Sequence, residues 1–303
     1  MRIATVAGSR RPFGVAALLA LVLAVACVAP ARAEELKPYK DGLFAYPRVL
    51  QSGDGGAYRV VDYQELRDIN QRDDVPERRV KSSYVSLRAN RLQSERTAGT
   101  RLGGLRHFAV GQLKGARYIT IYAHGQGGNR KQGANDRTFG GNFNRIKNLM
   151  ASNGGLYLSP DVPGFDAASA GAVADLLAAY LDASPQARLF VACGSAGGAV
   201  CYALADDPKI AARLSGMLFL GSFQDAGFLS SAAVARRVPV YFGHGSRDTV
   251  FAIADQEAFF RRLRALNGYP AQFVRFETGT HGTPIRMVDW RETLNWMLAN
   301  PPG

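Results

Sequence analysis

Residues 189–204 read LFVACGSAGGAVCYAL, the most informative stretch of the chain. An apolar run typical of a buried strand leads into small residues, and an apolar helical run follows them. A serine at such a sharp strand-to-helix turn exposes its hydroxyl group, but the turn is cramped and requires small residues two positions before and two positions after it. Cys193 and Gly197 are small enough. Ser195 is therefore a candidate nucleophile.

The rest of the chain alternates short apolar strands with amphipathic helices. The strand candidates are residues 118–123, 156–159, 189–193, 217–220, 238–242 and 273–276. Near-continuous apolar runs of this kind suit strands that are buried on both faces. The helix candidates are residues 173–181, 259–266 and 290–298, where apolar side chains recur at helical spacing. The alternation predicts an α/β fold with a mainly parallel central sheet and helices on both faces.

The N-terminal part of the domain has a different pattern. Short alternating runs at 80–87 and 107–113 predict antiparallel strands at the N-terminal edge of the sheet. Residues 34–78 are mixed in composition and rich in turn formers, so we interpret them as a lead-in segment packed on a domain that covers residues 79–303. A chain of 303 residues with 47% hydrophobic content has ample material for one large core.

Polar residues follow three other strands of the predicted sheet. A glycine-rich segment that begins with His124 follows the strand at 118–123, and Asp248 and His281 follow the strands at 238–242 and 273–276. In a parallel α/β sheet, functional groups collect at the carboxyl ends of the strands. We therefore expect these residues to lie near Ser195.

Taken together, these segments resemble the α/β-hydrolase superfamily of carboxylesterases, lipases and dienelactone hydrolases. The run from Gly194 to Gly198 is similar to the nucleophile elbow of that superfamily, with Cys193 where glycine is usual. The resemblance implies that Ser195 is the nucleophile, His281 the general base and Asp248 the acid that orients the base, in the chain order Ser, Asp, His.

The resemblance also implies an oxyanion hole, made by the backbone N–H groups of Gln126 and Ala196. It leaves Asp225, after the preceding strand, as the alternative acid. His124 and His244 are expected to have structural roles.

The implied reaction is the hydrolysis of carboxylic esters through an acyl-enzyme on Ser195. It requires no metal and no organic cofactor, and metal-ligand spacing is absent from the sequence. Two alternatives stay open: a serine peptidase with the same triad, and a non-catalytic binding protein that retains the fold.

The expected partner is a small-molecule ester or acyl substrate. Phe165 and Phe223 follow strand ends and are candidates for lining an acyl pocket, although phenylalanines in such positions more often fill the core. Arg137 lies in the loop after the glycine-rich segment and fits an anionic or hydroxyl-rich substrate, although surface solubility is an equal explanation. No long insertion interrupts the later strands, which favours short or soluble esters over long-chain lipids. The sequence does not indicate the oligomeric state.

Residues 1–33 are typical of a secretion signal. Arg2, Arg10 and Arg11 precede an apolar run, and no acidic residue occurs in the segment. The adjacent arginines resemble the twin-arginine motif, while ordinary export is an equal alternative. We expect an exported protein, periplasmic or secreted, without a stable membrane span; a lipid anchor at Cys27 is the minor alternative.

The net charge of +12 is concentrated locally. Between Arg78 and Arg117 there are ten Lys or Arg residues and one acidic residue, Glu95. No aromatic ladder or known nucleic-acid motif accompanies this charge, so nucleic-acid binding is not expected. In the exported chain, Cys193 and Cys201 could form a disulfide, but the sequence does not certify the geometry, and two buried thiols are the expectation.

Overall fold

A computed structural model describes residues 1–5, 8, 34–75 and 78–303. The chain divides into two units, Met1–Arg32 and Ala33–Gly303, and the fold described here is that of the second unit. The expected secretion signal, including Cys27, lies almost entirely outside the described residues. Within the described part of the chain, every helix is too short or too polar to span a bilayer.

A ten-stranded sheet forms the centre of this unit, in the order β1-β2-β12-β11-β10-β9-β7-β8-β6-β5. All neighbours from β2 to β8 in this order are parallel, whereas β1–β2, β8–β6 and β6–β5 are antiparallel. The strands are β1 (Val49–Gly53), β2 (Tyr58–Asp62), β5 (Gln93–Ala98), β6 (Leu105–Gly111), β7 (Tyr118–Ala123), β8 (Leu156–Pro160), β9 (Arg188–Gly194), β10 (Leu214–Leu220), β11 (Val240–Gly245) and β12 (Ala271–Glu277). A separate pair consists of β3 (Asp73–Asp74) and β4 (Arg79–Val80).

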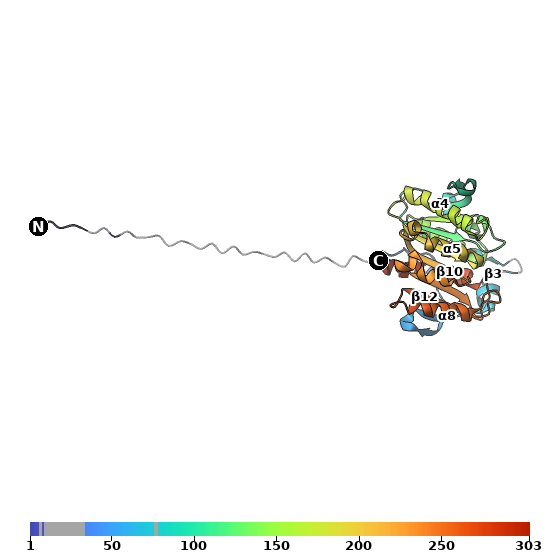
Figure 1. The fold of residues 1–303 in the computed structure, drawn as a ribbon. Coiled ribbons are helices and arrows are strands. Elements are labelled where there is room, and N and C mark those ends of the chain that lie inside the picture. The colour runs from blue at the N-terminus through green and yellow to red at the C-terminus, as the bar shows by residue number, and fades with distance from the viewer. Residues whose placement is uncertain (6–7, 9–33, 76–77) are drawn as a thin grey trace. The chain divides into compact units, whose positions relative to one another are not determined.

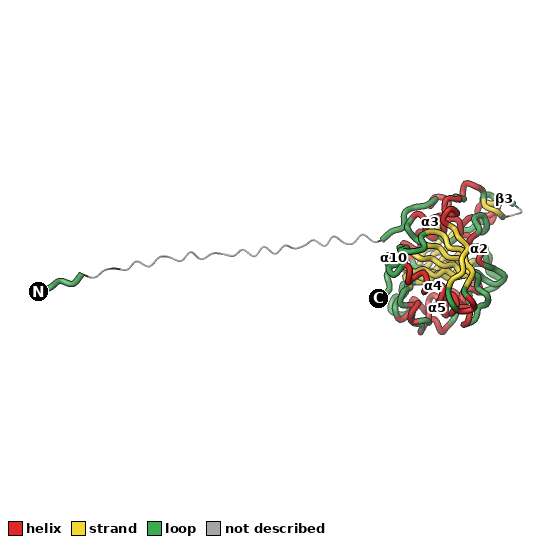
Figure 2. Tube along the Cα trace, turned by 90° about the horizontal axis from the view of Figure 1, so that it is seen from above, coloured by secondary structure: helices red, strands yellow, loops and turns green. Residues whose placement is uncertain are grey.

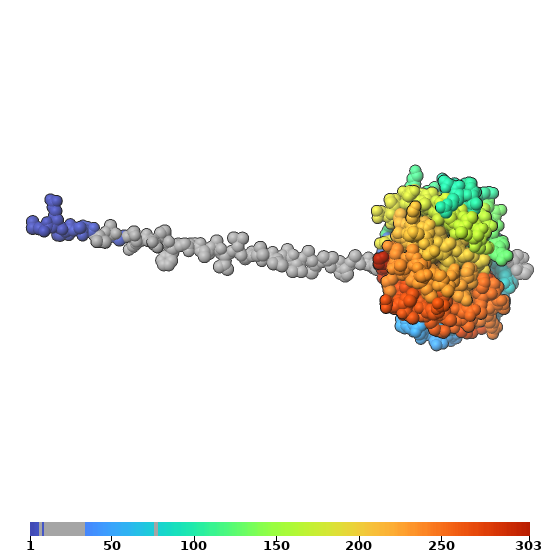
Figure 3. Space-filling view, viewed as in Figure 1, coloured from blue at the N-terminus to red at the C-terminus, as the bar shows by residue number. Residues whose placement is uncertain are grey.

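Helices cover both faces of the sheet. In Figure 2 the yellow strands lie between α3 on one side and α4 and α5 on the other. Figure 1 shows α4, α5 and α8 on one face of the sheet. In the space-filling view from the same side, the side chains of this face hide the sheet (Figure 3). The α-helices are α1 (Asp41–Phe44), α2 (Arg130–Ala134), α3 (Asn142–Ser152), α4 (Ala167–Ala183), α5 (Gly198–Asp206), α6 (Pro208–Ala211), α7 (Ala232–Ala235), α8 (Ile253–Arg264), α9 (Thr283–Met287) and α10 (Trp290–Ala299).

Each face of the sheet has its own hydrophobic core, as strand geometry requires. Ile119 and Ile121 of β7 join the core under α4 and α5, whereas Tyr118 and Tyr122 join the core under α3 and α10. Successive side chains of a strand point to opposite faces, so an entirely apolar strand supplies both cores at once. The predicted fold class, a mainly parallel sheet covered on both faces, is confirmed.

The structure corrects the sequence interpretation at the N-terminal side. The segment at 34–78 does not merely pack on the domain, because it contributes β1 and β2 to the central sheet. The strand expected at 80–87 is absent beyond Val80, and short 3-10 turns replace it. The side-chain amide of Asn144 donates to the Ser86 carbonyl at 2.9 Å and accepts from its N–H at 2.9 Å, so it takes the backbone groups that a strand would pair. The second expected strand exists as β6, and its partner at the edge is β5.

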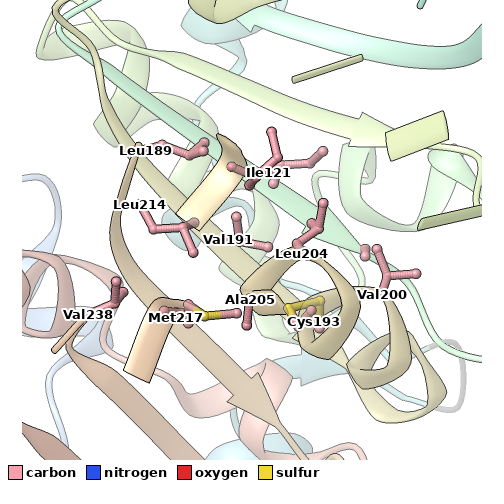
Figure 4. Packing of buried hydrophobic residues seen from close by; sticks show 14 of the residues in the cluster. Ile121, Leu189, Val191, Cys193, Val200, Leu204, Ala205, Leu214, Met217 and Val238 are labelled. Atoms are coloured by element: carbon pink, nitrogen blue, oxygen red, sulfur yellow. A yellow bond between two sulfur atoms is a disulfide. The ribbon is translucent and has the colours of Figure 1, made fainter. Parts of the chain in front are cut away.

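Cys193 and Cys201 form a disulfide, with their Cα atoms 6.2 Å apart. The expectation of two buried thiols is therefore wrong. Cys193 lies near the end of β9 and Cys201 lies within α5, and the packing of this helix against the sheet brings the two sulfur atoms together (Figure 4).

Candidate active site

Ser195 begins the short 3-10 turn Ser195–Gly197 that joins β9 to α5. We call residues 193–198, which contain this turn, the elbow. Its φ angle is 51°, in the left-handed region that costs a non-glycine residue roughly 1–3 kcal/mol. The surroundings hold this conformation. A Cβ atom at Gly197 would lie 2.7 Å from the carbonyl oxygens of both Ala123 and His124, so the elbow packs directly on the end of β7.

His281 lies in the loop after β12 and bridges Ser195 and Asp248. Its Nε2 atom is 2.8 Å from Ser195 Oγ, and its Nδ1 atom is 2.8 Å from Asp248 Oδ2. The side chain of His281 is 28% exposed and that of Asp248 is fully buried. Nδ1–H can donate to the carboxylate while Nε2 accepts from the serine hydroxyl, which is the arrangement that activates a serine.

Asp248 is held by donors on both carboxylate oxygens. Oδ1 accepts from the N–H groups of Val250 at 2.8 Å and Phe251 at 3.1 Å, and Oδ2 lies 3.2 Å from His244 Nε2 as well as near His281. Burial by itself would raise the pKa of Asp248, but the hydrogen bonds from the two histidines and the two backbone N–H groups outweigh it and hold the pKa well below its ordinary value. The carboxylate is therefore ionised at neutral pH.

The alternative acid lies elsewhere. Asp225 is exposed, and its Oδ1 atom accepts from the Gly227 N–H at 2.8 Å as the cap of a short 3-10 helix. The structure thus brings Asp248 to His281 and leaves Asp225 in a local turn.

The segment after β7 lies against Ser195. A Cβ atom at Gly125 would be 2.8 Å from Ser195 Cβ, so only glycine permits this approach. His124 donates from Nδ1 to the Gly125 carbonyl at 2.8 Å, and its Nε2 accepts from the Val162 N–H at 3.0 Å. Burial lowers the pKa of His124, which is therefore neutral and structural. The next residue in the segment is Gln126, whose N–H is one of the two expected oxyanion donors.

Phe251 was missed by the sequence reasoning. Its ring meets the His281 ring edge-on, with centroids 5.6 Å apart, and Phe223 packs against Phe251 with centroids 5.7 Å apart. The sequence indicates its place near the site only through its position three residues after Asp248, in the same loop. Phe165 is half-buried and packs against the core under α4 and α5.

Arg137 is occupied within the protein. Its guanidinium donates to the Val80 carbonyl at 3.0 Å and to Ser82 Oγ at 3.3 Å. These bonds tie the loop after α2 to the segment around β4, so substrate would have to compete with them for this side chain.

A cavity of about 220 Å³ adjoins the loop that carries His281. The residues lining it are Tyr63, Ile69, Arg78, Thr138, Phe139, Thr280, Gly282, Thr283 and Arg286. Arg286 is not a free cation, because it forms a forked pair with the buried carboxylate of Asp73 at 2.6 and 3.0 Å. Larger hollows of about 590 and 470 Å³ lie near the amino ends of the strands, away from Ser195.

Nothing in the described residues forms a group of three or more His, Cys, Asp or Glu side chains suited to hold a metal ion.

No protein-family model and no curated protein matches this sequence. Solved structures do match its fold. A thermostable esterase superposes with a TM-score of 0.56 at 12% identity over 71% of this chain and 64% of its own, so this chain spans less than two thirds of that esterase. A protein of unknown function from Agrobacterium tumefaciens, described as a candidate α/β hydrolase, has a TM-score of 0.55 at 16% identity, over 70% of this chain and 99% of its own. An esterase from Pyrococcus furiosus has a TM-score of 0.50 at 14% identity, over 69% of this chain and 92% of its own. This chain has the α/β-hydrolase fold.

Proposed function

We propose that this protein is a serine hydrolase that cleaves carboxylic esters, with Ser195 as nucleophile, His281 as general base and Asp248 as orienting acid. The observation that carries the proposal is the continuous chain of hydrogen bonds from Asp248 through His281 to Ser195, at 2.8 Å for each step. The esterases among the structures of similar fold support an ester substrate.

In the first step, Ser195 Oγ attacks the acyl carbonyl carbon and its proton passes to His281 Nε2. The imidazolium that forms lies beside the ionised carboxylate of Asp248, which stabilises the new positive charge. The carbonyl oxygen becomes an oxyanion, and the N–H groups of Gln126 and Ala196 are assigned to it. Collapse of this intermediate expels the alcohol, which takes the proton from His281, and leaves the acyl group on Ser195.

In the second step, water attacks the acyl-enzyme and gives a proton to His281 Nε2. The second tetrahedral intermediate expels Ser195 Oγ, which recovers that proton. The products are one carboxylic acid and one alcohol, and the enzyme returns to its starting state.

The absence of a long insertion between the later strands supports a short or soluble ester substrate. We expect turnover of aryl esters to peak at short acyl chains, and a clear optimum at long chains would contradict this expectation.

Labelling with a fluorophosphonate tests the nucleophile. We expect the wild type to label, Ser195→Ala to lose all labelling, and Ser83→Ala, a matched change at an exposed serine, to label normally. A panel of chromogenic esters and peptides then separates the two enzyme classes: preferential turnover of peptides would replace the esterase by a peptidase. Absence of labelling in folded wild type would favour a non-catalytic binding protein.

We also propose that the protein is exported. The basic and apolar pattern of residues 1–33 supports this, and so does the disulfide, because disulfides persist mainly in oxidising compartments. Fractionation of cells that express the full chain, followed by N-terminal sequencing, tests it. A protein retained in the cytoplasm with an intact N-terminus would refute the proposal.

A further inference from the structure

We propose that the disulfide between Cys193 and Cys201 is a positioning element for the nucleophile: it ties the end of β9 to α5 across Ser195 and so holds the elbow in its reactive geometry. This inference rests on the proposed function of Ser195.

The bridge encloses the nucleophile. Cys193 is two residues before Ser195 and near the end of β9, and Cys201 is the fourth residue of α5. The loop that it closes therefore contains Ser195 and the expected oxyanion donor Ala196. Both cysteines are fully buried in the core between the sheet and α5, as Figure 4 shows for Cys193 and its neighbours.

The elbow needs such support because its backbone is strained. The left-handed conformation of Ser195 persists only where the surroundings over-determine it. Two non-covalent contacts hold the turn from the sheet side: Gly197 packs on the end of β7, and Ser222 Oγ donates to the Ser195 carbonyl at 2.9 Å. The disulfide adds a covalent restraint between the strand that enters the elbow and the helix that leaves it.

Accurate placement is critical at this point because the reacting groups come from separate segments. Ser195 follows β9 and His281 follows β12, and their atoms must stay within hydrogen-bonding distance, now 2.8 Å. A displacement of about 1 Å can lower catalysis by about a hundredfold. By contrast, a bridge between residues only eight apart in sequence removes less chain entropy from the unfolded state than a bridge that closes a long loop.

The test compares the oxidised wild type with the double variant Cys193→Ala/Cys201→Ala. We expect the rate constant of fluorophosphonate labelling and kcat to fall together by about tenfold or more, with KM within about threefold, in protein that is still folded by circular dichroism. Val200→Ala is the control, because it removes packing from the same helix and leaves the bridge intact. It should lower Tm with kcat within about twofold of wild type.

A double variant that stays folded and keeps both rates within about twofold of wild type would overturn the proposal, even if its Tm fell. If the double variant does not fold, the same rates are measured on wild type reduced by a phosphine in dilute urea, with free thiols counted by mass spectrometry, and the same two outcomes decide. The proposed function fails separately: oxidised wild type that neither labels nor turns over esters would refute it.

Discussion

Replacing Asp248 by Asn is the sharpest test of the site, because it changes one charge and nearly no volume. The amide oxygen can still accept from the N–H groups of Val250 and Phe251, which now bind Oδ1. The amide nitrogen then takes the place of Oδ2 and meets the donors of His244 and His281. A donor that faces a donor is unfavourable, so His281 is pushed to carry its proton on Nε2.

Two effects then reduce catalysis. First, a histidine protonated on Nε2 cannot accept the proton of Ser195. Second, the imidazolium loses its counter-ion. Unit charges about 4 Å apart attract by about 4 kcal/mol at an effective dielectric constant of 20, which corresponds to about a thousandfold in rate. The Nε2-protonated tautomer of His281 lowers the rate further, so we expect kcat to fall by about 10⁴-fold in total. The same substitution in a serine protease triad causes a loss of this size.

The assay is steady-state hydrolysis of a short aryl ester at pH 7 to 8, with circular dichroism to establish folding. Asp225→Asn is the matched control, since its carboxylate is exposed and only caps a turn; we expect kcat to change by less than about twofold. Substantial activity in the Asp248 variant, together with a large loss in the Asp225 variant, would refute the reasoning and make Asp225 the acid.

Three other perturbations test separate features. Gly125→Ala places a Cβ atom 2.8 Å from the nucleophile's own Cβ, so kcat should fall about a hundredfold, whereas Gly42→Ala, with no atom within 4 Å, should leave kcat unchanged. Asp73→Asn leaves the buried Arg286 without its counter-ion and should lower the free energy of unfolding, measured in urea, by about 3–5 kcal/mol. Its control, Glu65→Gln, breaks an exposed contact of 3.9 Å with Arg78 and should lower that free energy by less than about 1 kcal/mol. Finally, the pKa of Asp248 is lower in the folded protein than in the unfolded chain, so its ionised form stabilises the fold above the unfolded pKa of about 3.9, and this contribution is lost as pH falls toward the folded pKa. The difference in unfolding free energy between wild type and Asp248→Asn should therefore shrink below about pH 4. A difference that stays constant down to about pH 2 would contradict the assignment.

The fold class and the candidate nucleophile, histidine and acid could all be predicted from the amino-acid sequence. Strands such as β7 and β9 are read easily because burial on both faces demands uninterrupted apolar residues. The polar residues after those strands, among them His281, stand out because parallel strands deliver their carboxyl ends to one edge. Edge strand β5, with the sequence QSERTA, was not found, since one exposed edge and polar side chains leave no apolar pattern to read.

The contacts between distant residues became known from the folded structure. The pairing of Cys193 with Cys201, the hydrogen bond between Asp248 and His281 and the contact of Phe251 with His281 each depend on how a helix or loop packs on the sheet. Local patterns report whether a residue is buried and which element it occupies, because hydrophobic periodicity follows from backbone geometry. Distances between residues far apart in the chain follow from the packing of all the elements together, which no local stretch of sequence contains.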